Sequence, residues 1–298
     1  MSSARAIQNL KNICKPSKIG HAGTLDPFAS GLLIVGIGKA TRLIEYATNK
    51  HKVYEFEVTW GKSTDTFDLT GEIVQESLIR PDNTQIENII SKFLGEIEQT
   101  PPSYSAIKIN GIRAYKLARD NIDFHLTSKR VNAYELYIIK NVFMQNNTVT
   151  KSKYIDKTTF YLKCGKGFYV RSLAVDLASA LNTLGYVSKL RRIESGKFSV
   201  KNAISVDYIN ELCNKGGDKS SINDLMHPIC DMLDDIPVYH ISNHELDRII
   251  HGHSIMICQN MSLSENDIVQ VIKDDAIIAL CYYSAGALYP KKCFYYTN

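Results

Sequence analysis

Residues 20–31 read Gly-His-Ala-Gly-Thr-Leu-Asp-Pro-Phe-Ala-Ser-Gly, and an apolar run, Leu-Leu-Ile-Val, follows at residues 32–35. The proline after Asp26 disfavours the α region for the aspartate and favours an extended or turn conformation. The glycines of the stretch allow the backbone to fold closely around it. An Asp-Pro pair alone would indicate only a turn, but a turn requires neither an upstream histidine nor a following apolar run. The stretch therefore predicts a short carboxylate held on a rigid loop beside a buried strand.

The composition is that of a globular protein with room for two domains. The chain has 298 residues, of which 44% are apolar, and domains commonly contain about 100–200 residues. The sequence has no run of about 18 apolar residues, and residues 1–5 lack the apolar core of a signal peptide. We therefore expect a cytoplasmic protein that does not contact a membrane.

The charged residues and the cysteines exclude some site classes. Seven cysteines without a C-x-x-C pair indicate neither a disulfide framework nor a zinc site. The two carboxylates of residues 64–71 are too few for a metal site, and His251 and His253 lack further ligands at usable spacing. A net charge of +4 is a weak argument for nucleic acid, so local clustering must support that hypothesis. No metal is expected.

Hydrophobic periodicity predicts a chain that mixes helices and strands. Residues 53–60 alternate, with Tyr54 leading the apolar face, which is the period of a half-buried strand. The residues at 145–148 predict a turn. Helical spacing is present at residues 2–13, 84–94 and 171–184, and strand-like runs are present at residues 32–37, 131–140, 158–164, 268–272, 276–283 and 293–296.

Residues 100–119 combine tyrosines with four basic residues. Cations meet phosphates and aromatic rings stack on unpaired bases, so this pattern suits RNA. A solvated amphipathic helix is the alternative interpretation. Further along, Arg171 falls in the first turn of a predicted helix, where a cation opposes the helix dipole. We therefore expect Arg171 to have an acidic partner.

The stretch at residues 20–31 resembles the signature of the TruB family of pseudouridine synthases, which isomerise the T-loop uridine of tRNA. A second match is Pro-x-x-Tyr-Ser-Ala-x-Lys-x-x-Gly-x-x-x-Tyr-x-x-Ala-Arg, at residues 101–119. A third is Lys-Gly-x-Tyr-x-Arg, at residues 166–171. The resemblance is dense over residues 2–200 and loose over residues 235–298.

The resemblance implies a role for each matching residue. Asp26 is implied as the nucleophile, and Arg171 as its partner, which keeps it ionised. Tyr54 is implied to pack against the flipped uridine as a catalytic and substrate-binding residue. Tyr169 and Leu190 are implied as walls of the base pocket, and His21 as a flat ring that fills the space left by the extruded base. Arg191 and Arg192 are left as phosphate contacts or scaffold.

The resemblance also implies the architecture. We expect an α+β catalytic domain over residues 1–230, with a mixed, largely antiparallel sheet flanked by helices, the pseudouridine synthase fold. A small β-rich PUA-like RNA-binding domain is expected over residues 235–298, after a charged, flexible stretch at 214–221. The family usually begins with an apolar strand and an Asp-Lys-Pro turn. This sequence starts at Met1-Ser2-Ser3, so we expect that strand to be missing and a sheet edge or apolar groove to be exposed.

The predicted reaction is the isomerisation of uridine to pseudouridine in the T-stem-loop of tRNA, by a monomer. The reaction involves no redox change and no external energy, so no cofactor is expected. One alternative is a non-catalytic RNA-binding protein, against which the presence of Asp26, Tyr54 and Arg171 argues. Another is an aspartate-dependent nucleoside hydrolase, which would need a water path and an activating base or metal.

Overall fold

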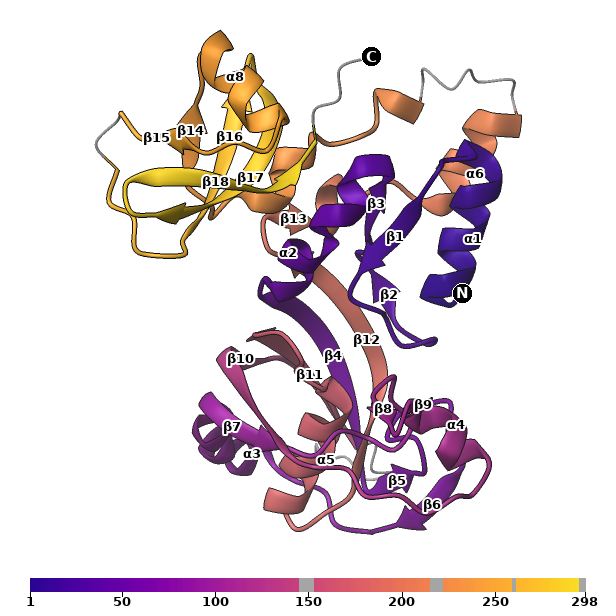
Figure 1. The fold of residues 1–298 in the computed structure, drawn as a ribbon. Helices are drawn as coiled ribbons and strands as arrows, with labels where there is room; N and C mark the ends of the chain where they lie inside the picture. The colour runs from indigo at the N-terminus through magenta and orange to yellow at the C-terminus, as the bar shows by residue number, and fades with distance from the viewer. Residues whose placement is uncertain (145–152, 215–221, 259–260, 295–298) are drawn as a thin grey trace.

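The computed structural model describes residues 1–144, 153–214, 222–258 and 261–294 (Figure 1). The turn predicted at residues 145–148 and nearly all of the stretch at 214–221 lie outside the described residues. Within the described ranges, no helix is long and apolar enough to span a bilayer.

A seven-stranded sheet is the centre of the fold (Figure 1). All of its pairings are antiparallel except that of β2 with β12. Its strands in spatial order are β13 (Phe198–Ser199), β12 (Gly185–Ser195), β4 (Lys52–Trp60), β11 (Ile155–Cys164), β10 (Lys129–Phe143) and β7 (Gly95–Gln99), with β2 (Ser30–Gly31) on β12 beside this path. The strands predicted at residues 53–60, 131–140 and 158–164 are present within β4, β10 and β11.

One face of this sheet is covered by α5 (Val170–Ala180) and α3 (Asn83–Ile90). Leu173 and Leu177 of α5 are fully buried against the sheet. Phe56 on β4 and Phe160 on β11 stack with their ring centroids 5.2 Å apart. Because side chains alternate across a strand, the apolar face predicted for residues 53–60 is the one that enters this core.

A second group of elements lies at the other end of the long strands β4 and β12 (Figure 1). It contains α1 (Ser3–Cys14), β1 (Ile19–Ala22), β3 (Ile34–Ile37), η1 (Gly38–Leu43), α2 (Ile44–Asn49), η3 (Val200–Asn202), α6 (Val206–Asn214) and η4 (Ile229–Leu233). Beside the central sheet lie β5 (Lys62–Thr64), β6 (Ile73–Glu76), η2 (Ser91–Phe93), β8 (Lys108–Ile109), β9 (Ile112–Arg113) and α4 (Ala114–Arg119). The strand predicted at 32–37 is shorter than expected, because Leu32 bonds to β12 instead of β1.

The C-terminal residues form a separate five-stranded sheet with its own core of buried side chains, including Tyr239, Val271 and Leu288. Its elements are β14 (Val238–His240), α8 (Asn243–Ile250), β15 (Ile255–Met256), β16 (Ile268–Lys273), β17 (Ala276–Ser284) and β18 (Ala287–Cys293). Together the two sheets confirm the expected α+β fold with a β-rich C-terminal part.

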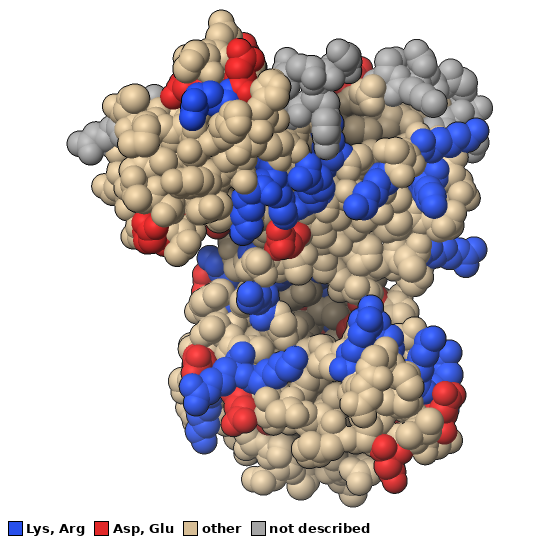
Figure 2. All heavy atoms as spheres, viewed as in Figure 1, with Lys and Arg blue, Asp and Glu red and all other residues tan. Residues whose placement is uncertain are grey.

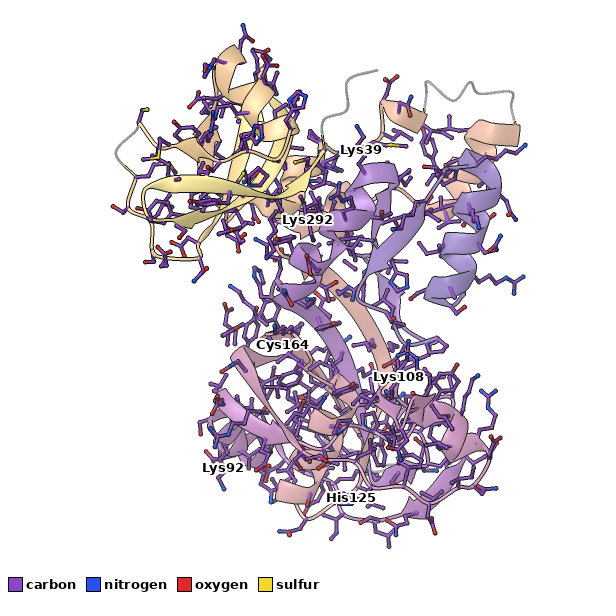
Figure 3. The ribbon with its side chains drawn as sticks, viewed as in Figure 1. Lys39, Lys92, Lys108, His125, Cys164 and Lys292 are labelled. Atoms are coloured by element: carbon purple, nitrogen blue, oxygen red, sulfur yellow. The ribbon has the colours of Figure 1, made fainter. Side chains whose placement is uncertain are left out.

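The C-terminal sheet docks on the N-terminal elements through buried apolar side chains, among them Leu43 and Leu280. Lys39 donates to the Phe294 carbonyl at 2.7 Å, and Lys292 donates to the Arg42 carbonyl at 3.0 Å. Figure 3 shows both lysines at this junction. These cations therefore hold the two parts together.

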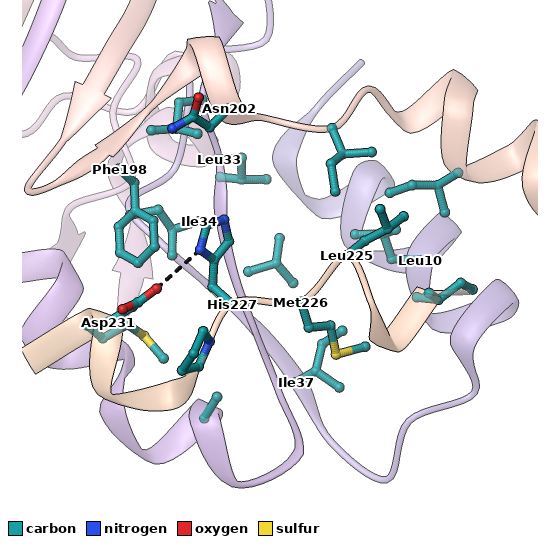
Figure 4. A pocket seen from close by; sticks show the side chains of 18 of the residues that line it. Leu10, Leu33, Ile34, Ile37, Phe198, Asn202, Leu225, Met226, His227 and Asp231 are labelled. Atoms are coloured by element: carbon teal, nitrogen blue, oxygen red, sulfur yellow. Dashed lines mark hydrogen bonds and ion pairs between the residues drawn. The ribbon is translucent and has the colours of Figure 1, made fainter. Parts of the chain in front are cut away.

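An apolar cavity of about 530 Å³ lies between α1, β3 and residues 222–232. Leu33 and Ile37 point into it (Figure 4). Its polar lining includes His227 and Asp231, which bond to each other at 3.1 Å. The cavity lies apart from Asp26 and contains none of the predicted site residues, so it is not assigned to the chemistry.

The buried hydrogen bond between Trp60 and Thr158 in this core can be tested by mutation. Trp60 donates from its indole nitrogen to the Thr158 hydroxyl at 2.9 Å, and both residues are fully buried. Thr158→Val removes the acceptor at nearly constant shape and leaves the indole N–H unsatisfied. We expect a loss of about 1–3 kcal/mol of unfolding free energy, measured by urea titration with the fluorescence of Trp60, the single tryptophan. Thr158→Ser, which keeps the hydroxyl, should lose less, and equal losses would contradict the assignment.

Candidate active site

The loop that carries Asp26 is fixed at several points along the backbone. The Asp26 carbonyl accepts from the Ala29 amide at 2.9 Å, which closes a turn over the proline. The Leu25 amide donates to the Ser3 hydroxyl at 3.0 Å. Gly31 has a φ of +99°, and a Cβ there would lie 2.2 Å from the Arg192 carbonyl oxygen. Only glycine fits this close approach to β12.

Arg171 grips the Asp26 carboxylate with two parallel hydrogen bonds. Its Nε donates to Oδ2 at 3.0 Å and its Nη2 donates to Oδ1 at 2.9 Å. Arg171 itself is 4% exposed, at the start of α5. This bidentate geometry is among the stronger polar contacts in proteins. The acidic partner predicted for Arg171 is therefore confirmed.

Three further oxygen atoms hold the same guanidinium. The carbonyl groups of Thr66 and Tyr104 accept from it at 2.9 and 3.0 Å. The Asp68 carboxylate lies 3.4 Å from Nη1. Asp68 is itself buried and accepts from the amide and hydroxyl of Thr70. The loop at residues 64–71 thus supplies a second carboxylate to Arg171.

The electrostatics of Asp26 differ from expectation. Burial raises the pKa of the Asp26 carboxyl above its usual value, the Arg171 charge and hydrogen bonds oppose that rise, and the Asp68 charge adds to it. From the cation alone we expected a lowered pKa. That expectation is wrong in its net direction, because the loss of solvent outweighs the guanidinium. Arg171 counters the rise without cancelling it.

The tyrosines and the leucine predicted for the pocket come from three elements. Tyr54 on β4 lies in register with Arg192 of β12, and its phenol is close enough to Asp26 to feel its charge. Burial raises the pKa of Tyr54, so the phenol is neutral near pH 7. Leu190 is buried on the same strand and the same face as Arg192. Tyr169 also feels the Asp26 charge.

Tyr169 is held from its backbone at the residue before α5. Its amide donates to the side chain of Gln99 at 3.0 Å, and the Gln99 side-chain nitrogen donates back to the Tyr169 carbonyl at 3.2 Å. Gln99 is 1% exposed at the end of β7. The Gln99 side chain therefore fixes the turn from which both Tyr169 and Arg171 project.

His21 lies on β1, opposite Val35 of β3. Its Nδ1 is buried and has no hydrogen-bond partner among the residues that the structure describes. Burial, and then the charge of Arg192, lowers the pKa of His21. The ring is therefore neutral near pH 7.

This chain is similar to known proteins over nearly its full length. A family model described as "TruB family pseudouridylate synthase (N terminal domain)" matches residues 11–170, and one described as "tRNA pseudouridylate synthase B C-terminal domain" matches residues 171–234. The chain belongs to the TruB family of pseudouridylate synthases. It is 38% identical to the tRNA pseudouridine synthase B of Ehrlichia ruminantium over 296 residues, covering 99% of this chain and 95% of that one. It is 34% identical to the tRNA pseudouridine synthase B of Caulobacter vibrioides, covering 100% of this chain and 93% of that one.

Solved structures share the fold at lower sequence identity. The chain aligns with a TM-score of 0.72 to a protein in "Structure of H/ACA RNP bound to a substrate RNA containing 2'-deoxyuridine", at 19% identity, covering 99% of this chain and 82% of that one. A "Cbf5-Nop10-Gar1 Complex" gives a TM-score of 0.70 at 21% identity, covering 99% of this chain and 82% of that one. These likenesses confirm the fold class.

Sequence reasoning missed several residues of this TruB-family site. Asp68 and Gln99 were not assigned roles at Asp26, because neither stands close to it in the sequence. One sequence signal for this part of the site was usable, because Tyr169 and Arg171 belong to the same short motif at residues 166–171. Among the described residues, no three His, Cys, Asp or Glu side chains gather closely enough to hold a metal ion.

The Arg171 contacts predict a pH-dependent loss of stability. Arg171→Met leaves the Asp68 carboxylate buried without its cation, which should cost about 3–5 kcal/mol near pH 7. It also removes both causes that lower the pKa of Asp26. A folded-state pKa above the unfolded value means that stability is lost as the pH rises. We therefore expect the deficit to grow from about pH 4, near the pKa of an unperturbed aspartate, toward neutrality.

Urea titrations at several pH values measure this deficit against the parent. The double variant Arg171→Met/Asp26→Asn is the control. It has no titratable carboxyl group at position 26, so the pH dependence of its unfolding free energy should be flatter. A deficit that is the same at every pH in both variants would contradict the pairing as the cause.

Proposed function

We propose that this protein isomerises the T-loop uridine of tRNA to pseudouridine, with Asp26 as the nucleophile. The observation that carries the proposal is the bidentate grip of buried Arg171 on Asp26, at distances of 2.9 and 3.0 Å. Full-length similarity to proteins named tRNA pseudouridine synthase B supports the substrate and the reaction.

The chemistry requires an ionised carboxylate at the sugar. The bond between uracil N1 and C1′ breaks, the base turns and C5 bonds to C1′. The C5 proton leaves to solvent and N1 takes up a proton, so the atoms balance without any co-reactant. Asp26 acts either by attacking C1′ or by removing a proton from the sugar, and both routes begin with the carboxylate. Arg171 opposes the burial that would otherwise protonate Asp26 more fully.

The detached uracil must be retained while it turns. In this proposal Tyr54, Tyr169 and Leu190 form the walls of the base pocket, and they present two rings and an apolar side chain to the base. The charge of Asp26 acts on the Tyr54 phenol, and we assign Tyr54 to both the chemistry and the packing of the base. Because its phenol is neutral near pH 7, it can hydrogen-bond or stack without adding charge to the pocket.

The substrate must first be extruded from its loop, which costs a few kcal/mol. A neutral His21 ring can occupy the vacated space. Basic residues border the site, among them Lys108 (Figure 3), and Lys and Arg side chains flank the hollow between the central sheet and the N-terminal elements (Figure 2). Such cations suit the phosphates of the T-stem-loop.

The proposal extends to organisation and location. Residues 1–230 form the catalytic domain, and the separate core of residues 235–298 supports a PUA-like RNA-binding domain there. We further propose that the protein works in the cytoplasm as a monomer and without a metal or cofactor.

Release of tritium from tRNA transcribed with 5-tritiated uridine tests the reaction. We expect the parent to release tritium and Asp26→Asn to be slower by at least about a thousandfold, as for loss of a nucleophile elsewhere. Asp207→Asn is the matched control, because Asp207 is an exposed carboxylate on α6, away from the loops that hold Arg171, and should keep the parental rate. If the parent binds tRNA but releases no tritium, a non-catalytic RNA-binding function replaces this proposal.

The neutral His21 ring predicts a second pair of variants. His21→Phe keeps a flat ring and should retain the rate to within about fivefold, whereas His21→Ala should lose about 1–3 kcal/mol, the usual worth of one base–aromatic stack. Single-turnover tritium release measures both. A loss in His21→Phe as large as that in His21→Ala would show that the ring nitrogens, not the ring shape, are needed.

A further inference from the structure

Arg192 is a cation buried next to the Asp26 loop. It is 1% exposed and is one of the largest fully buried side chains. Across the part of the chain that the structure describes, no carboxylate lies within salt-bridge distance of it. Removing a cation from water is costly when no counter-charge compensates it. The hydrogen-bond acceptors of Arg192 therefore identify the chain segments that this buried charge holds.

The Arg192 guanidinium bonds to both ends of the Asp26 loop. Its Nε donates to the Leu32 carbonyl at 2.8 Å, and its Nη2 donates to the Gly23 carbonyl at 3.1 Å. The Leu32 amide in turn donates to the Arg192 carbonyl at 2.9 Å. Gly23 precedes Asp26 and Leu32 follows it, so one residue of β12 closes the loop from both sides.

The backbone of the loop is built for this close approach. A Cβ on Gly23 would lie 3.3 Å from Nη1 of Arg192. At Gly31 the same addition would clash with the Arg192 main chain, as described above. Both glycines have a positive φ, which other residues rarely adopt. The side chain and main chain of Arg192 thus set where the loop lies.

The same guanidinium also reaches Tyr54. Tyr54 and Arg192 are register partners on adjacent strands, and the charge of Arg192 opposes the rise of the Tyr54 pKa that burial causes. The Arg192 charge is also felt by Lys52, whose pKa falls to about 8, mainly through burial. One buried residue therefore bonds to the loop that carries Asp26 and lies opposite Tyr54 on the adjacent strand.

We propose that Arg192 is a positioning residue that holds the Asp26 loop at a fixed distance from Tyr54. This proposal rests on the proposed function, because the distance between the Asp26 loop and Tyr54 affects the rate only if Asp26 reacts with a nucleotide whose base Tyr54 holds. Arg192 does not bond to the Asp26 carboxylate and so acts through the loop and the phenol. A purely structural arginine would instead affect folding, RNA binding and rate together.

The experiment separates these two roles. Arg192→Met and Arg192→Lys are compared with the parent and with Arg130→Met, which removes an arginine that is 80% exposed on β10. Filter binding gives the Kd for tRNA, and tritium release at saturating protein gives the single-turnover rate. All assays run well below the measured unfolding temperature of each variant.

We expect Arg192→Met to bind tRNA within about threefold of the parent but to react at least about 100-fold more slowly, the usual effect of misplacing a reacting group by about 1 Å. Arg192→Lys keeps the charge and one donor group and should recover part of that rate. Arg130→Met should change neither quantity. If Arg192→Met does not fold, Arg192→Lys carries the comparison.

A double-mutant cycle with Tyr54→Phe tests the link to the tyrosine. If Arg192 acts partly through the phenol, the loss caused by Arg192→Lys shrinks in the Tyr54→Phe background. The proposal is overturned if Arg192→Lys reacts at the parental rate, if the two losses multiply independently, or if rate and binding fall together. A parent that releases no tritium overturns the proposed function itself, whereas an active parent with equally active Arg192 variants overturns only the positioning role.

Discussion

A guanidinium with five donors, buried among oxygen atoms from three other chain segments, determines where the Asp26 carboxylate lies. Arg171 satisfies both oxygens of Asp26, the carbonyls of Thr66 and Tyr104, and the charge of Asp68. Each of these partners would be costly to leave unpaired. The loops at residues 23–29, 64–71 and 100–105 therefore depend on one side chain for their common meeting point. The same arrangement leaves the Asp26 carboxyl with a raised pKa, because burial exceeds the effect of the cation.

The long strands β4 and β12 position the remaining candidate site residues beside the Arg171–Asp26 pair. Side chains two residues apart share a face of a strand, so Leu190 and Arg192 project beside Tyr54 toward the loop. The short parallel pairing of β2 with β12 brings the loop to the sheet. Arg192 then fixes it there through Gly23 and Leu32. The cluster of buried apolar side chains at the junction, which includes Leu43 and Leu280, joins the C-terminal sheet to the elements that flank the loop.

The parts of the fold with a strong periodic pattern could be predicted from the sequence. Residues 53–60 alternate cleanly and form β4, and Ser2 caps the predicted first helix. The Arg171–Asp26 pair was predicted because a cation at a helix start needs a partner, and the family resemblance named it. β12 was not predicted as a strand, because Arg191 and Arg192 interrupt its apolar pattern. The structure buries Arg192 and leaves Arg191 exposed.

The remaining features depend on tertiary contacts that the sequence does not display. Arg192 carries no mark that distinguishes it from its exposed neighbour Arg191, and only the meeting of β12 with the loop assigns it two carbonyl partners. The direction of the Asp26 pKa was also wrong from sequence, because the extent of burial cannot be read from neighbouring residues. The roles of Tyr54, Tyr169, Leu190 and His21 stay predictions.

The most direct test of the account is the acid limb of kcat/KM for pseudouridine formation, which reports groups of the free enzyme. It should be measured in the parent and in His21→Phe, so that the imidazole cannot produce the limb. The account predicts that log kcat/KM falls with unit slope as the pH drops, in both proteins, with a midpoint above about 3.9, the ordinary value for aspartate. A rate that stays level down to that pH, or a limb that disappears in His21→Phe, would contradict the partly buried Asp26 carboxylate as the reacting group.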